Sequence, residues 1–214
     1  MLLKKATYLI SNPTYKTCPK ADKPEYAFIG RSNVGKSSLI NMLCNNSKLA
    51  KTSANPGKTQ MINHFLIESK ASEKAASSFW YLVDLPGYGY AKIAQKQRDV
   101  WEKMIADYLS NRPNLVQVFV LIDSRHEPQK IDLEFVNQLG AANVPFALVF
   151  TKADKEKPGA VQRHVQAFLE ALRATWQFLP QTFITSAEKK VGRAELLAHI
   201  QMLNDRVYND AHEA

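Results

Sequence analysis

The chain has 214 residues, of which 45% are hydrophobic and 22% are charged, as expected for one folded globular domain. No run approaches the roughly 20 apolar residues of a membrane-spanning helix, the first residues lack the apolar core of a secretory signal, and the two cysteines suggest neither a disulfide framework nor a zinc site. We therefore expect a cytoplasmic protein that does not bind a membrane.

The net charge of +8 is concentrated near the N-terminus. Residues 1–60 contain ten Lys or Arg residues against two acidic ones, whereas residues 61–214 balance to zero. Such an excess favours an acidic partner, with RNA as the leading candidate and a merely solvated basic face as the alternative. The lysines available for such a partner are Lys4, Lys5, Lys16, Lys20, Lys23, Lys48 and Lys51.

Apolar periodicity predicts strands and helices in alternation after a weak strand or extended arm over residues 5–11. Predicted strands cover 25–29, 61–68, 79–83, 115–122, 146–150 and 182–185, and predicted helices cover 38–43, 93–109, 131–139, 160–176 and 193–208. This order predicts an α/β fold with a doubly wound, mostly parallel sheet of about six strands, one antiparallel edge strand and helices on both faces. We expect one domain at residues 25–210, an N-terminal extension at 1–24 packed on or near it, and a C-terminal tail at 211–214.

A phosphate-loop motif connects the first core strand to the first helix. It reads Gly30-Arg31-Ser32-Asn33-Val34-Gly35-Lys36-Ser37, which matches G-x-x-x-x-G-K-[ST] in the required context. Its glycines let backbone N–H groups point at a polyphosphate, and the helix adds the positive end of its dipole. We expect all eight residues to bind a nucleotide, with Lys36 as a catalytic residue at the β- and γ-phosphates and Ser37 as a Mg²⁺ ligand.

Two further segments would complete the phosphate side of this site. Asp84-Leu85-Pro86-Gly87 ends a buried strand, so Asp84 can hold the Mg²⁺ shell through water and Gly87 can donate its N–H to a γ-phosphate. The loop after the first helix contains Gly57-Lys58-Thr59-Gln60-Met61, in which Thr59 is the expected catalytic residue and second Mg²⁺ ligand when a γ-phosphate is present. Thr52 is the competing ligand, and an ordinary loop threonine is the other interpretation.

Two motifs near the ends of later strands predict guanine recognition. The carboxylate in Thr151-Lys152-Ala153-Asp154 can accept hydrogen bonds from guanine N1–H and the 2-amino group, a donor pair that adenine lacks. Thr185-Ser186-Ala187 can offer a backbone N–H to guanine O6, although this motif alone is equally consistent with a helix cap. The sequence thus predicts GTP and GDP as ligands.

Taken together, these motifs resemble the EngB (YihA/YsxC) family, in the TrmE-Era-EngA-EngB-Septin-like class of GTPases. The resemblance rests on residues 30–41, 56–60, 84–92 and 151–155, with Lys58 where the family pattern suggests Arg. Arg125-His126 and the predicted helix that contains Trp101 also resemble the family, so the resemblance covers nearly the whole chain. It implies a P-loop NTPase with a Ras-like G domain that uses Mg²⁺. It also implies a bacterial GTPase, expected to be a monomer, that acts with ribosomal RNA in assembly of the large (50S) ribosomal subunit and is needed for normal cell division and septation.

The residue after Gly87 bears on the rate of hydrolysis. In Ras-type enzymes a Gln at this position orients water, whereas here it is Tyr88, so we expect slow intrinsic hydrolysis. Asn33 occupies the loop position where potassium-activated relatives place a K⁺ ligand, which predicts K⁺ as a second cofactor and a catalytic role for Asn33; alternatively, Asn33 only braces the loop. Two other functions stay open: a division factor that recruits proteins rather than RNA, and a P-loop kinase or ATPase.

Overall fold

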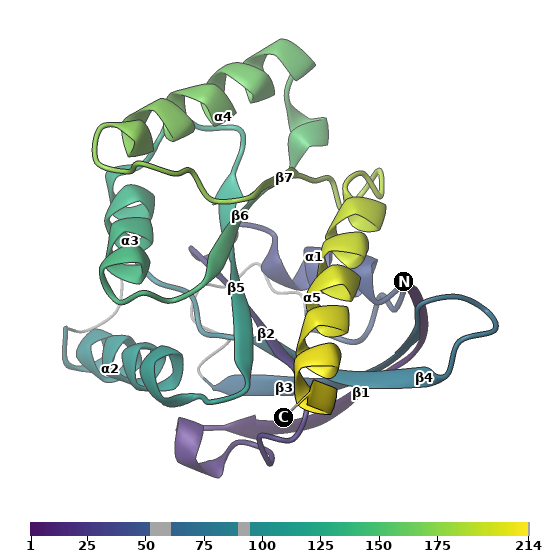
Figure 1. Ribbon diagram of the computed structural model, residues 1–214. Helices are drawn as coiled ribbons and strands as arrows, with labels where there is room; N and C mark the ends of the chain where they lie inside the picture. Colours follow the sequence, from purple (N-terminus) through teal and green to yellow (C-terminus); the bar gives the residue numbers. More distant parts are fainter. Residues whose placement is uncertain (52–60, 90–94, 214) are drawn as a thin grey trace.

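The computed structural model describes residues 1–51, 61–89 and 95–213, and a seven-stranded sheet runs through its centre (Figure 1). The strand order is β1-β3-β4-β2-β5-β6-β7, and β3 is antiparallel to both β1 and β4 while the remaining neighbours are parallel. The strands are β1 (Leu2–Asn12), β2 (Glu25–Gly30), β3 (Ile62–Lys70), β4 (Ser77–Asp84), β5 (Leu115–Asp123), β6 (Phe146–Thr151) and β7 (Thr182–Ile184).

The predicted fold class is confirmed, and the sheet gains a seventh strand from the N-terminal segment. Residues 2–12 pair along almost the whole length of β3, so the predicted extended arm is an edge strand. The predicted strands at 61–68 and 79–83 form a hairpin, because β3 and β4 pair in antiparallel register up to Lys70 and Ser77. The antiparallel strand β3 therefore lies one position inside the edge that β1 forms.

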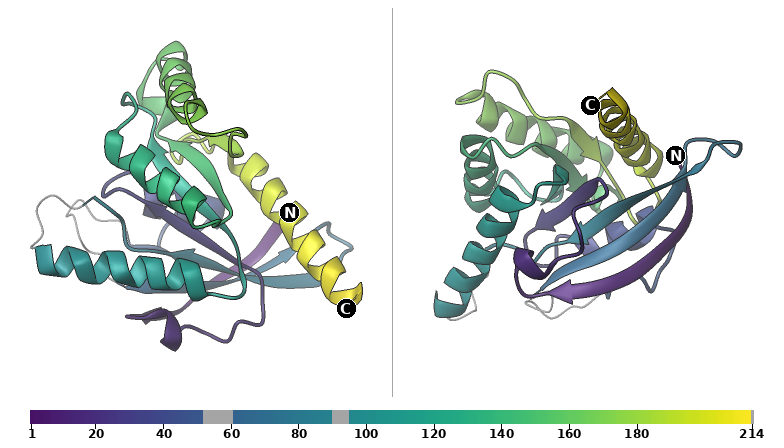
Figure 2. Two further views of the ribbon diagram at one scale, coloured as in Figure 1. Left: turned by 60° about the vertical axis from the view of Figure 1, so that its left-hand side comes forward. Right: turned by 60° about the horizontal axis from the view of Figure 1, so that its bottom comes forward.

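Helices cover both faces of the sheet (Figure 2). One apolar core cluster joins the sheet to α1 and α5, and the other joins its opposite face to α2, α3 and α4. None of the described helices is long and apolar enough to cross a membrane. The helices are α1 (Lys36–Leu43), α2 (Gln95–Asn111), α3 (Lys130–Ala141), α4 (Pro158–Arg173) and α5 (Arg193–Glu213), with short 3₁₀ helices η1 (Tyr15–Thr17) and η2 (Ala153–Lys155).

Two helices, α4 and α5, depart most from their predicted C-terminal ends. Helix α4 ends at Arg173, so Trp176, which was predicted to be helical, follows the helix and packs its ring against Gly140 of α3. Helix α5 continues to Glu213, beyond the predicted domain boundary at residue 210. Trp101 of α2 lies in the core, where it is 5% exposed.

Strand register brings the motifs to one edge of the sheet. Gly30 pairs with Leu121, Phe28 with Asp84, and Asp123 with Thr151. The carboxyl ends of β2, β4, β5 and β6 therefore lie side by side, which is where ligands bind in sheets of this kind.

Candidate nucleotide-binding site

The phosphate loop is held in a tight curve by its glycines and Asn33. A Cβ on Gly30 would lie 2.8 Å from the Leu121 carbonyl oxygen, so only glycine lets β2 pass this close to β5. Gly35 has φ 102° and Asn33 has φ 61°, both in the left-handed region that turns the chain into α1. The loop thus has the backbone geometry that its sequence predicts.

Lys36 and Asp84 meet at the start of α1. The Lys36 ammonium donates to the Asp84 carboxylate, and the two side chains are only 10% and 5% exposed. The segment after Asp84 stays beside the loop, because Leu85 N–H donates to the Phe28 carbonyl oxygen at 3.0 Å and Tyr88 forms a backbone bridge with Arg31. Two motifs separated in the sequence therefore lie together at the predicted phosphate side of the site.

Ser37 and Asp84 provide oxygen donors that suit Mg²⁺. The ion prefers hydroxyl, carboxylate and water oxygens, and Ser37 lies in the first turn of α1, directly after the lysine that contacts Asp84. Within the described residues there is no group of three His, Cys, Asp or Glu side chains that could hold a metal by themselves. The oxygen atoms of Ser37 and Asp84 suit a metal that shares its coordination with phosphate and water.

A cavity of about 200 Å³ lies between the phosphate loop and the two predicted guanine motifs. Ser186 donates a hydrogen bond to Asp154 Oδ1 at 2.5 Å, and this bond is the main cause that lowers the pKa of the Asp154 carboxyl below its ordinary value. Asp154 is therefore ionised and oriented near neutral pH. The cavity is lined by Gly35, Ser38, Leu39, Thr151, Lys152, Asp154, Lys155, Thr185, Ala187 and Glu188.

Lys152 connects the base side of the site to the phosphate side. Its ammonium donates to the Asn33 carbonyl oxygen at 2.6 Å and to Asp123 Oδ2 at 2.8 Å. Lys152 also has φ 60°, and η2, with Ala153 as its first residue, follows directly. This conformation sends its side chain across the loop rather than out to solvent.

Several predicted residues act through packing or backbone contacts in this structure. Thr151 donates its hydroxyl to the Val34 carbonyl oxygen at 2.6 Å, so it ties the strand end to the loop. The side chains of Val34 and Leu85 lie in the apolar core, which leaves only their backbone for a ligand. Thr185 donates its hydroxyl to the Phe150 carbonyl oxygen at 3.0 Å.

The remaining predicted residues fall into two groups. Ser32 and Pro86 lie in the described turns around the site, and Met61 is 45% exposed just before β3. The other group, Gly57, Lys58, Thr59 and Gln60 with the rival ligand Thr52, lies outside the described residues, as do residues 90–92 of the motif that begins at Asp84.

Sequence reasoning missed Asp123 and Arg125 as parts of this site. Arg125 donates two hydrogen bonds to the Asp123 carboxylate, from Nε at 2.9 Å and from Nη2 at 2.8 Å. The Lys152 ammonium donates to the same carboxylate. Burial opposes ionisation of Asp123, but the bonds from Arg125 and Lys152 outweigh it and lower its pKa. A signal was present in the sequence, because Asp123 follows a buried parallel strand whose carboxyl end had to lie at this edge.

Known proteins resemble this chain over most of its length. A family profile described as "50S ribosome-binding GTPase" matches residues 25–152. The probable GTP-binding protein EngB of Bacteroides fragilis is 53% identical over 204 residues, which cover 95% of this chain and 97% of that protein. The EngB protein of Flavobacterium johnsoniae is 48% identical over 211 residues, with 98% and 96% coverage.

Solved structures share the fold. A crystal structure of a probable GTP-binding protein EngB aligns with a TM-score of 0.61 at 23% identity, covering 85% of this chain and 99% of that chain. Aquifex aeolicus Era bound to GDP and AlF₄⁻ aligns with a TM-score of 0.64 at 24% identity, covering 82% and 55%. Given the near-complete match to curated relatives at about half identity, this chain belongs to the EngB family of GTP-binding GTPases.

Proposed function

We propose that this protein is a GTP-controlled switch that hydrolyses GTP slowly and acts in assembly of the large ribosomal subunit in the bacterial cytosol. One observation carries the choice of nucleotide: Asp154, oriented by Ser186, lines a cavity that also borders the phosphate loop. Guanine presents two donors to such a carboxylate and adenine does not. A nucleotide in this place would have its phosphates at Gly30–Ser37.

Each residue on the phosphate side of the site would then have a separate role. Lys36, which now neutralises Asp84, would turn to the β- and γ-phosphates, and Asp84 would be released to the metal shell. Ser37 and Thr59 would hold Mg²⁺ together with GTP, and the ion would supply charge neutralisation at the phosphates. Gly87 would donate its N–H to the γ-phosphate. After hydrolysis this hydrogen bond would be lost, and the segment that contains Gly87 would return to its GDP-bound conformation.

Slow hydrolysis is supported by the position of Tyr88. Its side chain is buried against α3, so the residue in the usual water-orienting position does not face the phosphates. A cation at Asn33 would stabilise charge as an arginine finger does, an effect worth roughly 10³–10⁵ in rate. Rates of GTP turnover in K⁺ and Na⁺ buffers of equal ionic strength test this role, and equal rates would remove K⁺ from the proposal.

The ribosomal role is supported by the family profile and by exposed positive charge. Lys4 and Lys23 each form an ion pair with an acidic neighbour, at 2.9 Å in both cases. The other lysines of the N-terminal excess are exposed and available to an RNA backbone; they are Lys5, Lys16, Lys20, Lys48 and Lys51.

Competition for a fluorescent GDP analogue tests the nucleotide choice. GTP and GDP should displace it at far lower concentration than ATP, because adenine would leave Asp154 without its donors. Equal potency of ATP would favour the rival P-loop kinase or ATPase.

Sedimentation with purified large subunits tests the partner. The protein, expected to act as a monomer, should co-sediment in a non-hydrolysable GTP analogue and dissociate as salt rises, as an RNA contact requires. Loss of co-sedimentation in GDP would support the switch. Absence of salt-sensitive binding in the GTP analogue would favour a division factor that recruits proteins.

A further inference from the structure

The carboxylate of Asp132, in the first turn of α3, lies where two parts of the nucleotide site meet. Its Oδ1 accepts a hydrogen bond from Arg31 Nε in the phosphate loop at 3.0 Å and one from the Tyr88 hydroxyl at 2.8 Å. The Asp132 side chain is 1% exposed, and its Oδ2 has no hydrogen-bond partner among the described residues. A buried carboxylate that binds only through one shared oxygen is expensive as a purely structural feature.

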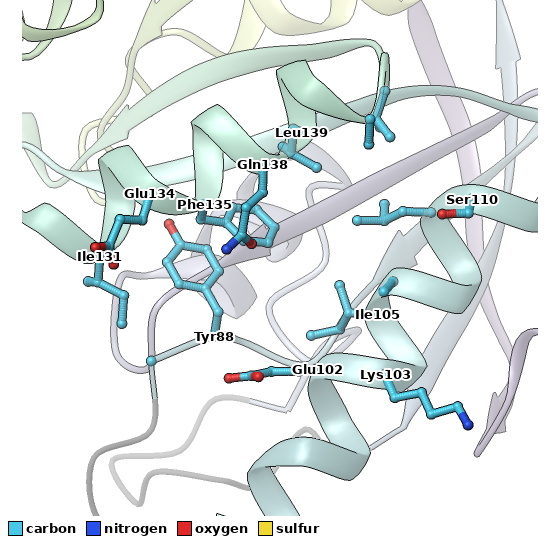
Figure 3. A pocket seen from close by; sticks show the side chains of 15 residues that line it. Tyr88, Glu102, Lys103, Ile105, Ser110, Ile131, Glu134, Phe135, Gln138 and Leu139 are labelled. Atoms are coloured by element: carbon cyan, nitrogen blue, oxygen red, sulfur yellow. The ribbon is translucent and has the colours of Figure 1, made fainter.

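Tyr88 and its neighbour Gly89 are fitted closely to α3. The Tyr88 ring stacks on Phe135 with centroids 4.2 Å apart and planes inclined by 16°. Gly89 has φ 74°, and a Cβ there would lie 2.6 Å from Ile131 Cδ1. Figure 3 shows the Tyr88 ring beside Phe135, where it forms one wall of a cavity of about 640 Å³ between α2 and α3. The segment after Gly87 thus has one defined place against this helix.

The same contacts hold that segment beside the phosphate loop. Arg31 and Tyr88 form a backbone bridge, and their side chains meet on Asp132. Gly87 is the residue directly before Tyr88, so fixing Tyr88 fixes the position of the Gly87 N–H relative to the loop. Only a nucleotide with a γ-phosphate would use that N–H.

We propose that Asp132 is a positioning residue for GTP. By holding Arg31 and Tyr88 together, it presents the Gly87 N–H to the γ-phosphate. It thereby raises the affinity of the site for GTP relative to its affinity for GDP. The proposal rests on the proposed GTP-binding function. It assigns to α3, which lies outside the phosphate loop and guanine motifs, a share in telling GTP from GDP.

The test compares dissociation constants for GDP and for a non-hydrolysable GTP analogue, both with Mg²⁺. Asp132→Ala should weaken the analogue about tenfold, the equivalent of one charge-assisted hydrogen bond, and weaken GDP much less. Asp132→Asn keeps an acceptor oxygen for both donors, so it should restore most of the preference. Glu134→Ala, on the exposed surface of the same helix, is the matched control and should leave both constants unchanged.

Tyr88→Phe keeps the ring stacked on Phe135 and removes only the hydroxyl, so it tests the same link where Asp132→Ala does not fold. It should also weaken the analogue more than GDP. If Asp132→Ala and Tyr88→Phe weaken binding of GDP and of the GTP analogue by the same factor, or leave the ratio of the two dissociation constants unchanged, the role of Asp132 is overturned. Damage to the fold would affect binding of both ligands alike. Failure of the wild-type protein to bind either nucleotide would instead refute the proposed function.

Discussion

Lys152 donates a hydrogen bond to the Asn33 carbonyl oxygen at 2.6 Å, and both residues have left-handed backbones. The same Lys152 ammonium also donates to Asp123 Oδ2 at 2.8 Å, so two hydrogen bonds fix its position beside the phosphate loop. The link joins the curved phosphate loop to the predicted guanine-recognition segment. Under the proposed function, binding of the base and binding of the phosphates would therefore be physically connected.

Lys152→Met should weaken GDP binding by about tenfold or more, because it removes charge-assisted bonds worth roughly 1.5–3 kcal/mol each and keeps most of the side chain's volume. Titration of a fluorescent GDP analogue measures the change. Lys130→Met is the control, since Lys130 lies on the exposed surface of α3, where it pairs with Glu134. Wild-type affinity in Lys152→Met would show that the loop keeps its shape without the crossing.

Asp154→Asn should reverse the choice of base. An amide can still accept one hydrogen bond, but it also donates, so it suits the 2-oxo group of xanthine better than the 2-amino group of guanine. GTP affinity should fall by a factor of about 100, with xanthosine triphosphate becoming the better ligand. Competition with both nucleotides is the measurement, and unchanged GTP preference would remove Asp154 from base recognition.

Glu25 should make stability depend on acid pH. Its carboxylate is fully buried at the start of β2 and accepts bonds from Arg112 at 2.9 and 2.8 Å and from the Tyr108 hydroxyl. Burial by itself raises its pKa, but the contacts with His64, 3.4 Å away, and with Arg112 outweigh burial and lower it from 4.5 to about 2. A lowered carboxyl pKa stabilises the fold above the unfolded value and loses that stability as pH falls toward the folded value.

The free energy of unfolding should therefore fall by on the order of 3 kcal/mol through this group alone as pH drops from about 5 to about 2. Urea unfolding at a series of pH values measures it. Glu25→Gln should be less stable at neutral pH, because Arg112 loses its partner, and should lose less on acidification. Parallel acid profiles for the two proteins would contradict the prediction.

Gly140→Ala separates helix propensity from tertiary packing. Propensity favours alanine by about 1 kcal/mol, but a Cβ there would lie 2.3 Å from Trp176 Cη2, and the Trp176 ring is also packed edge-on against Phe146. Overpacking costs about 1–3 kcal/mol, so we expect a net loss of about 1 kcal/mol. In Gly159→Ala, where the new Cβ would meet Arg163 Nη1 at an ordinary contact distance of 3.9 Å, a gain of about 0.5 kcal/mol is expected. Thermal unfolding of both variants checks the contrast.

Elements set by the local sequence pattern are predictable from the sequence, whereas those that depend on contacts between distant segments are not. The strands at 115–122 and 146–150 were visible because buried parallel strands are continuously apolar. The end of α4 was not, since Trp176 leaves the helix to pack on Gly140 of another helix. Likewise, the pairing of residues 2–12 with β3 depends on hydrogen bonds between segments about 60 residues apart, which no local pattern encodes.

Short-range spacing and residue chemistry are enough to predict the sheet class, the phosphate loop and the guanine motifs. The contacts of Lys36 with Asp84, of Lys152 with Asn33, and of Asp132 with Arg31 and Tyr88 are visible only in the folded chain. These contacts join residues far apart in the chain, and strand register and helix packing are what bring them within hydrogen-bond distance.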